Sequence, residues 1–224
     1  MLAAGRYRCA MRDFLRSLPV FAGVMPEFDA GAVPDDPAEL FASWLRDAVQ
    51  EGVPEPHAMT LSTSDLTGAP DGRTLILKDL DEQGWWFATS AESSKGVQLA
   101  THPAAALTFY WPQVGRQVRV RGPVVAGSAE QSEADFRSRG TGARAVALAS
   151  RESQPLDSRS ACAQAVADAE RQLAVVPDLA APSWQVYAVV ARTVEFWQAD
   201  KDRQHIRVQY RHGEPGWTRT LLWP

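Results

Sequence analysis

The sequence predicts one α+β domain built on antiparallel strands. Short apolar runs follow one another between residues 58 and 127, and tight turns join them. This spacing favours an antiparallel barrel or sandwich over alternating βαβ units. The stretch 128–176 is instead helical and polar, and strands return after it. We therefore expect an antiparallel sheet flanked by helices, with a helical insertion at about 128–176 and a C-terminal hairpin.

The composition is that of an ordinary globular chain and excludes several classes of partner. Hydrophobic residues make up 45% of the 224 residues, and the net charge is −4 without any basic block. We therefore expect no nucleic-acid partner. The N-terminus has no sustained apolar segment and no apolar run approaches ~18 residues, so we expect a soluble, cytoplasmic protein without a membrane partner. Cys9 and Cys162 fit no metal or redox spacing, and the four histidines show no ligand spacing, so we expect free thiols and no metal site.

The first 35 residues are expected to form an irregular arm, because prolines and glycines interrupt any periodicity there. This arm would be partly disordered, or would order over a partner or a ligand. The domain, residues 36–224, opens with a helix. Asp36 and Pro37 provide a cap and a proline at the first helical position, apolar residues then recur at helical spacing, and Gly52 and Pro54 end the helix. Its apolar stripe should pack on a sheet.

The remaining elements follow from strand-like runs, turns and helical periods. A turn at 81–84 is expected to fold the run 85–89 back beside 74–77 as a hairpin. In the strand at 116–125, Gln117, Arg119 and Arg121 alternate with valines, which predicts one polar and one apolar face. The expected strands are 58–64, 74–77, 85–89, 104–111, 116–125, 184–190, 193–197, 206–211 and 217–222. The further expected helices are 94–100, 129–138, 143–150 and 158–175.

A first candidate site surrounds the helix that begins near residue 94. Ser93, Ser94 and Lys95 bring hydroxyls, free backbone N–H groups and a cation to a helix start, which suits an anion. Arg73 and Lys78 bracket the neighbouring strand and could approach the same anion. The alternative is that these residues are solvated ends of strands and helices. The spacing G-x-x-x-x-G-K is absent, so a nucleoside triphosphatase is not expected.

A second candidate group is Arg203, His205 and Arg207. At a spacing of two in an extended segment, their side chains would point to one face. Two guanidiniums beside an imidazole should repel unless an anion or an electron-rich ring lies among them; the alternative is the exposed face of an edge strand. Gln117 could hydrogen-bond the edge of a heterocycle, and Arg139 could clamp a phosphate or interact with a helix dipole.

Several motifs, in this order, resemble the pyridoxamine 5'-phosphate oxidase family of FMN-binding split barrels. They are DPAELFASWL, RTLILK, FATSAESSKG, RQVRVRGPV, SRG followed by ASRES, EFWQ, RQHIR and a closing Trp217. The resemblance runs from about Asp36 to Pro224. It implies a Greek-key split barrel, a homodimer with FMN at the subunit interface, and a small-molecule substrate. It also implies an oxidase that passes a hydride from the 4' carbon of pyridoxine or pyridoxamine 5'-phosphate to the flavin, with O₂ as the acceptor.

The same resemblance assigns roles position by position. It places Arg73 and Lys95 at the FMN phosphate and makes Arg207 a candidate to stabilise the reduced, anionic flavin. The implied cofactor-binding residues are Arg73, Thr74, Leu75, Ile76, Leu77, Lys78, Ala88, Thr89, Ser94, Lys95, Gln117, Glu152, Ser153, Trp197 and Arg207. The implied substrate-binding residues are Lys78, Arg139, Arg203 and His205, and Arg203 and His205 are the catalytic candidates among them.

Several positions depart from the family's pattern, among them Ser94, which stands where a second arginine or a similar group usually precedes the helix lysine. Asp135 and Ala143 stand where a tyrosine and a serine usually help to hold the substrate phosphate, and Glu152 replaces a glutamine. A carboxylate beside a phosphate dianion weakens binding through like-charge repulsion. The arm is also spaced more like that of the phenazine-biosynthesis oxidases. An FMN-dependent oxidoreductase for a non-phosphorylated secondary metabolite, or a non-catalytic flavin-binding protein, are therefore alternatives.

Overall fold

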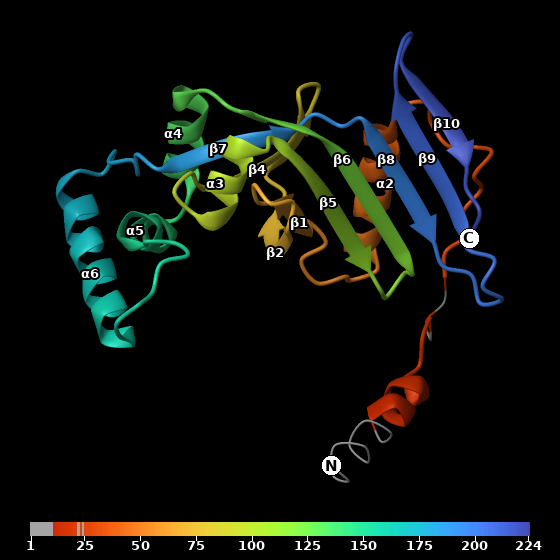
Figure 1. Ribbon diagram of the computed structural model, residues 1–224, viewed down its shortest axis with the longest axis horizontal. Coiled ribbons are helices and arrows are strands. Elements are labelled where there is room, and N and C mark those ends of the chain that lie inside the picture. Colours follow the sequence, from red (N-terminus) through yellow and green to blue (C-terminus); the bar gives the residue numbers. More distant parts are fainter. Residues whose placement is uncertain (1–10, 22, 24) are drawn as a thin grey trace.

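The computed structural model describes residues 11–21, 23 and 25–224 and places helices around a ten-stranded antiparallel sheet (Figure 1). The expectations for Cys9 and for the other arm residues among 1–10, 22 and 24 lie outside these residues, whereas residues 25–35 are irregular as expected. Residues 11–17 are helical, so the expectation of an irregular arm is wrong there. The physical reason is local, because residues 11–17 contain no proline or glycine and Pro19 follows this helix.

The elements of the domain agree closely with the expected ones. The helices are α2 (Pro37–Gln50), α3 (Ser94–Thr101), α4 (Ala129–Ser138), α5 (Thr141–Ala149) and α6 (Arg159–Val175). The strands are β1 (Ala58–Ser64), β2 (Pro70–Ile76), β3 (Asp79–Asp81), β4 (Gly84–Ser90), β5 (Ala104–Trp111), β6 (Arg116–Ala126), β7 (Trp184–Val189), β8 (Thr193–Gln198), β9 (Ile206–His212) and β10 (Trp217–Leu221).

Strand β6 joins the two parts of the sheet. The main path runs β10-β9-β8-β6-β5-β1-β2, and β7 pairs with both β6 and β4 beside this path. The first half of β6 pairs with β8 and its end pairs with β7. Gly122 lies at the change of partner, where a Cβ would lie 1.9 Å from the carbonyl oxygen of Val190. Only glycine allows the backbones to approach this closely.

Helix α2 packs against the apolar face of the curved sheet. Asp36 caps it by accepting a hydrogen bond from the N–H of Ala38. Phe41 of α2 lies against Trp85 and Phe109 with ring centroids 4.4 and 4.8 Å apart. The apolar side chains of β5, β6, β8 and β9 are buried in the same core, and Gln117, Arg119 and Arg121 lie on the more exposed face of β6, as predicted.

The expected hairpin between 74–77 and 85–89 is wrong. Strand β2 pairs with β1 along its whole length, and β4 instead pairs with the short β3 and with β7. Asp65 explains the difference, because its Oδ1 accepts hydrogen bonds from the N–H groups of Thr67 and Ala69 and closes a tight turn. β2 therefore begins at Pro70 and folds back on β1.

Helices α4, α5 and α6 form the predicted insertion between β6 and β7. Ser128 and Gln131 make a capping box at the start of α4. Ala145 of α5 packs with Ala169 and Leu173 of α6 in a small core of their own, and both helices extend beyond the end of the sheet (Figure 1). Within the described part of the chain, no helix has the length and apolar character needed to cross a membrane.

Candidate active site

A cleft of about 470 Å³ lies between β2, β4 and the helical insertion. Its lining residues are Thr74, Leu75, Ile76, Lys78, Ala88, Thr89, Ser90, Arg139, Val146, Ala147, Ser150, Glu152 and Trp184. Much of the predicted cofactor set and two of the predicted substrate residues are thus brought together. A larger hollow of about 680 Å³ on the outer face of the sheet is lined by none of the predicted site residues. We therefore place the site in the smaller cleft.

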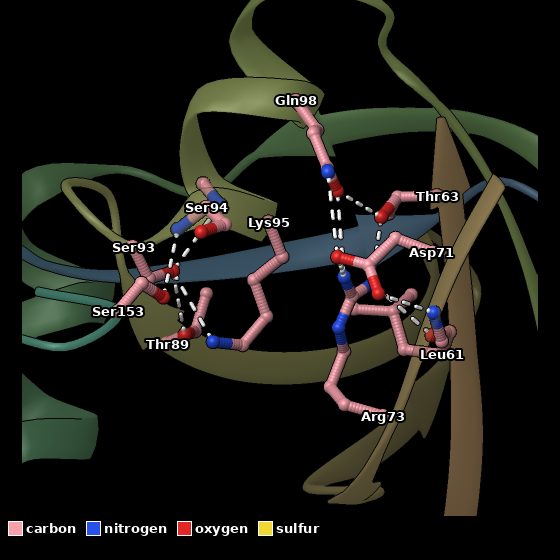
Figure 2. Close-up of polar contacts among 12 residues, drawn as sticks. Leu61, Thr63, Asp71, Arg73, Thr89, Ser93, Ser94, Lys95, Gln98 and Ser153 are labelled. Atoms are coloured by element: carbon pink, nitrogen blue, oxygen red, sulfur yellow. Dashed lines mark hydrogen bonds and ion pairs between the residues drawn. The ribbon is translucent and has the colours of Figure 1, made fainter. Parts of the chain in front are cut away.

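Lys95 lies behind the lining of this cleft, at the start of α3, where it contacts the lining residue Glu152. Ser93 caps α3 by accepting a hydrogen bond from the N–H of Gly96, and it accepts another from Lys95 Nζ at 3.2 Å. The Lys95 side chain is only 5% exposed and forms an ion pair with Glu152. Thr89 Oγ1 donates to the other carboxylate oxygen of Glu152 at 3.4 Å. Figure 2 shows Thr89, Ser93 and Lys95 meeting at the start of α3, where Lys95 and Thr89 also hold the Glu152 carboxylate.

Arg73 belongs to a neighbouring cluster on the other side of Lys95. Its Nη1 donates to Thr63 Oγ1 at 2.6 Å and to the carbonyl oxygen of Leu61 at 3.2 Å, and its Nη2 pairs with Asp71 at 2.5 Å. Figure 2 shows that Arg73 and Lys95 approach from β2 and α3 but have separate partners. Gln98 contacts Arg73 and lies on α3, the helix that also carries Lys95.

The donor set around α3 fits a phosphate-bearing cofactor. Two cations, hydroxyl groups and the first N–H groups of a helix are the ligands that bind phosphate in proteins. Ser94 N–H already donates to Ser153 Oγ at 3.1 Å, so the segment after α5 reaches this helix start. Two of these donors, Lys95 and Thr89, already bind an anionic group of the chain itself, the Glu152 carboxylate. The cradle therefore accepts an oxyanion.

Lys78 and Arg139 face the other part of the cleft. Lys78 Nζ lies 3.0 Å from Asp135 Oδ1, and Asp135 Oδ2 accepts from Trp184 Nε1 at 2.8 Å. The Arg139 guanidinium stacks over the Trp184 ring at 4.1 Å. Burial lowers the pKa of Arg139, and nearby Asp135 opposes that shift. Ala143 contributes its carbonyl oxygen, which accepts from Arg139 Nη2 at 3.3 Å.

Gln117, Trp197 and Arg207 form a second group that does not line this cleft. They are neighbours on β6, β8 and β9, since Gln117 is opposite Trp197 and Trp197 is opposite Arg207. Arg207 pairs with the buried Glu195 at 2.8 Å, and Arg119 pairs with the other oxygen of that carboxylate. Burial raises the pKa of Glu195, but these two arginines outweigh it and hold the pKa below its usual value.

Arg203, His205 and Arg207 do not share one face of a strand, and that expectation is wrong. β9 begins at Ile206, and Arg203 lies in the preceding turn with φ +66°. His205 Nδ1 accepts from the N–H of Asp200, and its ring lies 4.8 Å from that of Trp197. Of these three residues, Arg207 pairs with a carboxylate of the chain itself, that of Glu195.

Several residues of the site were missed from sequence. Trp184, Val146, Ala147 and Ser150 line the cleft, whereas the predicted Leu77 packs against the core. The helical spacing of Val146 and Ser150 could have placed both on one face of α5. Glu195 could also have been found, because strand alternation puts it on the face of Trp197.

Comparison with known proteins places these features in a family. Residues 45–173 match the model described as "Pyridoxamine 5'-phosphate oxidase", and residues 184–224 match "Pyridoxine 5'-phosphate oxidase C-terminal dimerisation region". The chain is 42% identical over 193 residues to the pyridoxine/pyridoxamine 5'-phosphate oxidase of Pseudomonas paraeruginosa, covering 85% of this chain and 90% of the relative. Identity to the enzyme of the same name from Paraburkholderia phymatum is 40% over 197 residues, covering 88% and 92%.

The fold is similar to that of PhzG from Burkholderia lata 383, solved in complex with tetrahydrophenazine-1-carboxylic acid. The TM-score is 0.84 at 27% identity, over 90% of this chain and all of the other. This likeness confirms the expected antiparallel split barrel flanked by helices. From the two family models and the identity to the named relatives, we conclude that the chain belongs to the pyridoxamine 5'-phosphate oxidase family.

Proposed function

We propose that the protein is an FMN-dependent oxidoreductase that oxidises the 4' carbon of pyridoxine or pyridoxamine 5'-phosphate to the aldehyde. Bound FMN supplies the hydride acceptor, and O₂ is the final electron acceptor. The observation that carries the proposal is the cleft, which joins an oxyanion cradle at Lys95 to a second cationic end at Lys78 and Arg139. The names of the relatives favour this substrate over a non-phosphorylated one and over a non-catalytic flavin protein.

The residues of the cleft would bind and orient the cofactor and the substrate. Lys95, with Ser93, Thr89 and the start of α3, would hold the cofactor phosphate, and the exposed edge of β2 from Thr74 to Ile76 would lie along the flavin. Lys78 and Arg139 would receive the substrate's phosphate at the far end. A phosphorylated cofactor and a phosphorylated substrate would thus have separate cationic ends.

We further propose that the group of Gln117, Trp197 and Arg207 completes the cleft of a second subunit in a homodimer. Trp197 and Arg207 lie within the segment that matches the family's dimerisation region, and none of the three lines the cleft of its own chain. His205 and Arg203 belong to the same segment and would reach the substrate from there. Arg207 would then lie near the flavin with its charge already balanced by Glu195.

Absorption and turnover test the activity. The purified protein should show a flavin spectrum, or gain it on adding FMN, and should form pyridoxal 5'-phosphate and hydrogen peroxide from pyridoxine 5'-phosphate. If the FMN-loaded protein shows no turnover over a wide range of substrate concentration, the proposed substrate is wrong. A colourless protein that cannot be reconstituted with FMN would contradict the proposal that this is an FMN-dependent enzyme.

Subunit complementation tests the shared site. Lys95→Ala and Arg207→Ala would each inactivate a homodimer, but a co-expressed mixture would contain heterodimers with one intact site. Random pairing predicts recovery of about a quarter of the wild-type rate. Absence of recovery, with heterodimers shown to form, would place both residues in the same subunit's site.

A further inference from the structure

Asp135 of α4 lies where the cleft meets the helical insertion. It bridges Lys78, which lies between β2 and β3, and Trp184 of β7, with contacts of 3.0 and 2.8 Å. The Asp135 side chain is 16% exposed and that of Lys78 31% exposed, so the pair is partly shielded from solvent. Both partners of Asp135 line the cleft. Its negative charge therefore acts at the end where a substrate anion would bind.

Arg139 is the other cation at this end and is held differently. It stacks on Trp184, and its Nη2 donates to one carbonyl oxygen. Its Nε is buried without a hydrogen-bond partner, and no carboxylate pairs with it among the residues that the structure describes. A buried donor without a partner is unfavourable, so an oxygen atom from a ligand would be stabilised here.

Two cations and one carboxylate leave this end of the cleft with one net positive charge. A phosphate monoester carries about −1.5 to −2 at neutral pH. Lys78 and Arg139 alone would balance that charge, whereas Asp135 leaves part of it unbalanced and adds repulsion. A singly charged group would be balanced fully by the same set.

We propose that Asp135 is a specificity-determining residue that weakens the binding of a phosphate dianion at this end of the cleft relative to the same ligand without its phosphate. This inference rests on the proposed function for the position of the substrate, but not on turnover. Asp135 also fixes the Trp184 ring on which Arg139 stacks, so it holds one cation in place while it neutralises the other.

The test compares two dead-end ligands on the FMN-loaded protein by calorimetry. 4'-Deoxypyridoxine 5'-phosphate and 4'-deoxypyridoxine lack the hydroxyl group that is oxidised, and the ratio of their affinities isolates the contribution of the phosphate. In Asp135→Asn the ratio should rise on the order of tenfold, since a charge next to the phosphate is removed. The amide oxygen can still accept from Trp184 Nε1, so the contact between α4 and β7 is kept.

Two further variants make the result specific. Glu133→Gln removes the same charge from α4, where Glu133 pairs with Arg137 at the surface, and should leave the ratio unchanged. The double variant Lys78→Met with Asp135→Asn restores one net charge and should return the ratio to near the wild-type value. An unchanged or lower ratio in Asp135→Asn, or a double variant that keeps the raised ratio, overturns the proposal. Because no turnover is needed, an inactive protein that binds both ligands rejects the oxidase activity without touching this inference.

Discussion

Glu152 is expected to compete with the cofactor phosphate for Lys95. Its carboxylate pairs with Lys95 and accepts a hydrogen bond from Thr89, so it occupies donors that a phosphate would use. In Glu152→Gln the charge is removed, while the amide can still hydrogen-bond Thr89. FMN should therefore bind more tightly to the variant.

The size of this effect follows from Coulomb's law and exposure. Two charges about 5 Å apart at an effective dielectric constant of about 20 repel by about 3 kcal/mol. The Glu152 side chain is 40% exposed, so solvent screens much of this repulsion and about 1 kcal/mol remains. That value corresponds to roughly fivefold tighter binding.

The assay is titration of the flavin-free protein with FMN, followed by quenching of flavin fluorescence. Glu170→Gln on α6 is the matched control, since it removes one exposed carboxylate from the same insertion away from the cleft. Equal or weaker FMN binding by Glu152→Gln would refute the reasoning and would make Glu152 a supporting residue of the cradle.

Three further predictions concern the sheet and the second group of residues. Gly122→Ala should lower the free energy of unfolding in urea by about 3 kcal/mol or prevent folding, because its Cβ would collide with the carbonyl oxygen of Val190; unchanged stability would contradict the close approach. The pKa of Glu195 is lower in the folded protein than in the unfolded chain, so the ionised carboxylate stabilises the fold. This stabilisation should be complete above the pKa of Glu195 in the unfolded chain, about 4.3, and should be lost as the pH falls through its pKa in the folded protein. Glu195→Gln should be less stable at neutral pH and should lack that part of the acid dependence in pH-resolved unfolding curves. His205→Ala and Arg207→Ala should each lower kcat/KM by at least about tenfold, and normal rates would remove both residues from the site. His205→Ala should change Tm little, whereas Arg207→Ala should also lower Tm because it leaves the buried Glu195 with one arginine fewer.

The strands and helices were predictable because their signals are local. The cap at Asp36, the alternation from Gln117 to Arg121 and the capping serine before Lys95 each depend on residues within a few positions of one another. The first hairpin was not predictable in this way. Its partner depended on the turn that Asp65 closes and on competition between strands for neighbours, which no local period records.

The candidate site, too, was predictable only in the part that depends on local sequence. The sequence by itself indicated an oxyanion site at Arg73 and Lys95 and, through its motifs, the family and its flavin. The pairings of Lys78 with Asp135, Lys95 with Glu152 and Arg207 with Glu195 became visible only in the folded chain. Such pairings join residues distant in sequence, and only the order of strands and the docking of the insertion bring them within a few ångströms. The first two of these pairings set the net charge of the side chains at the two ends of the cleft.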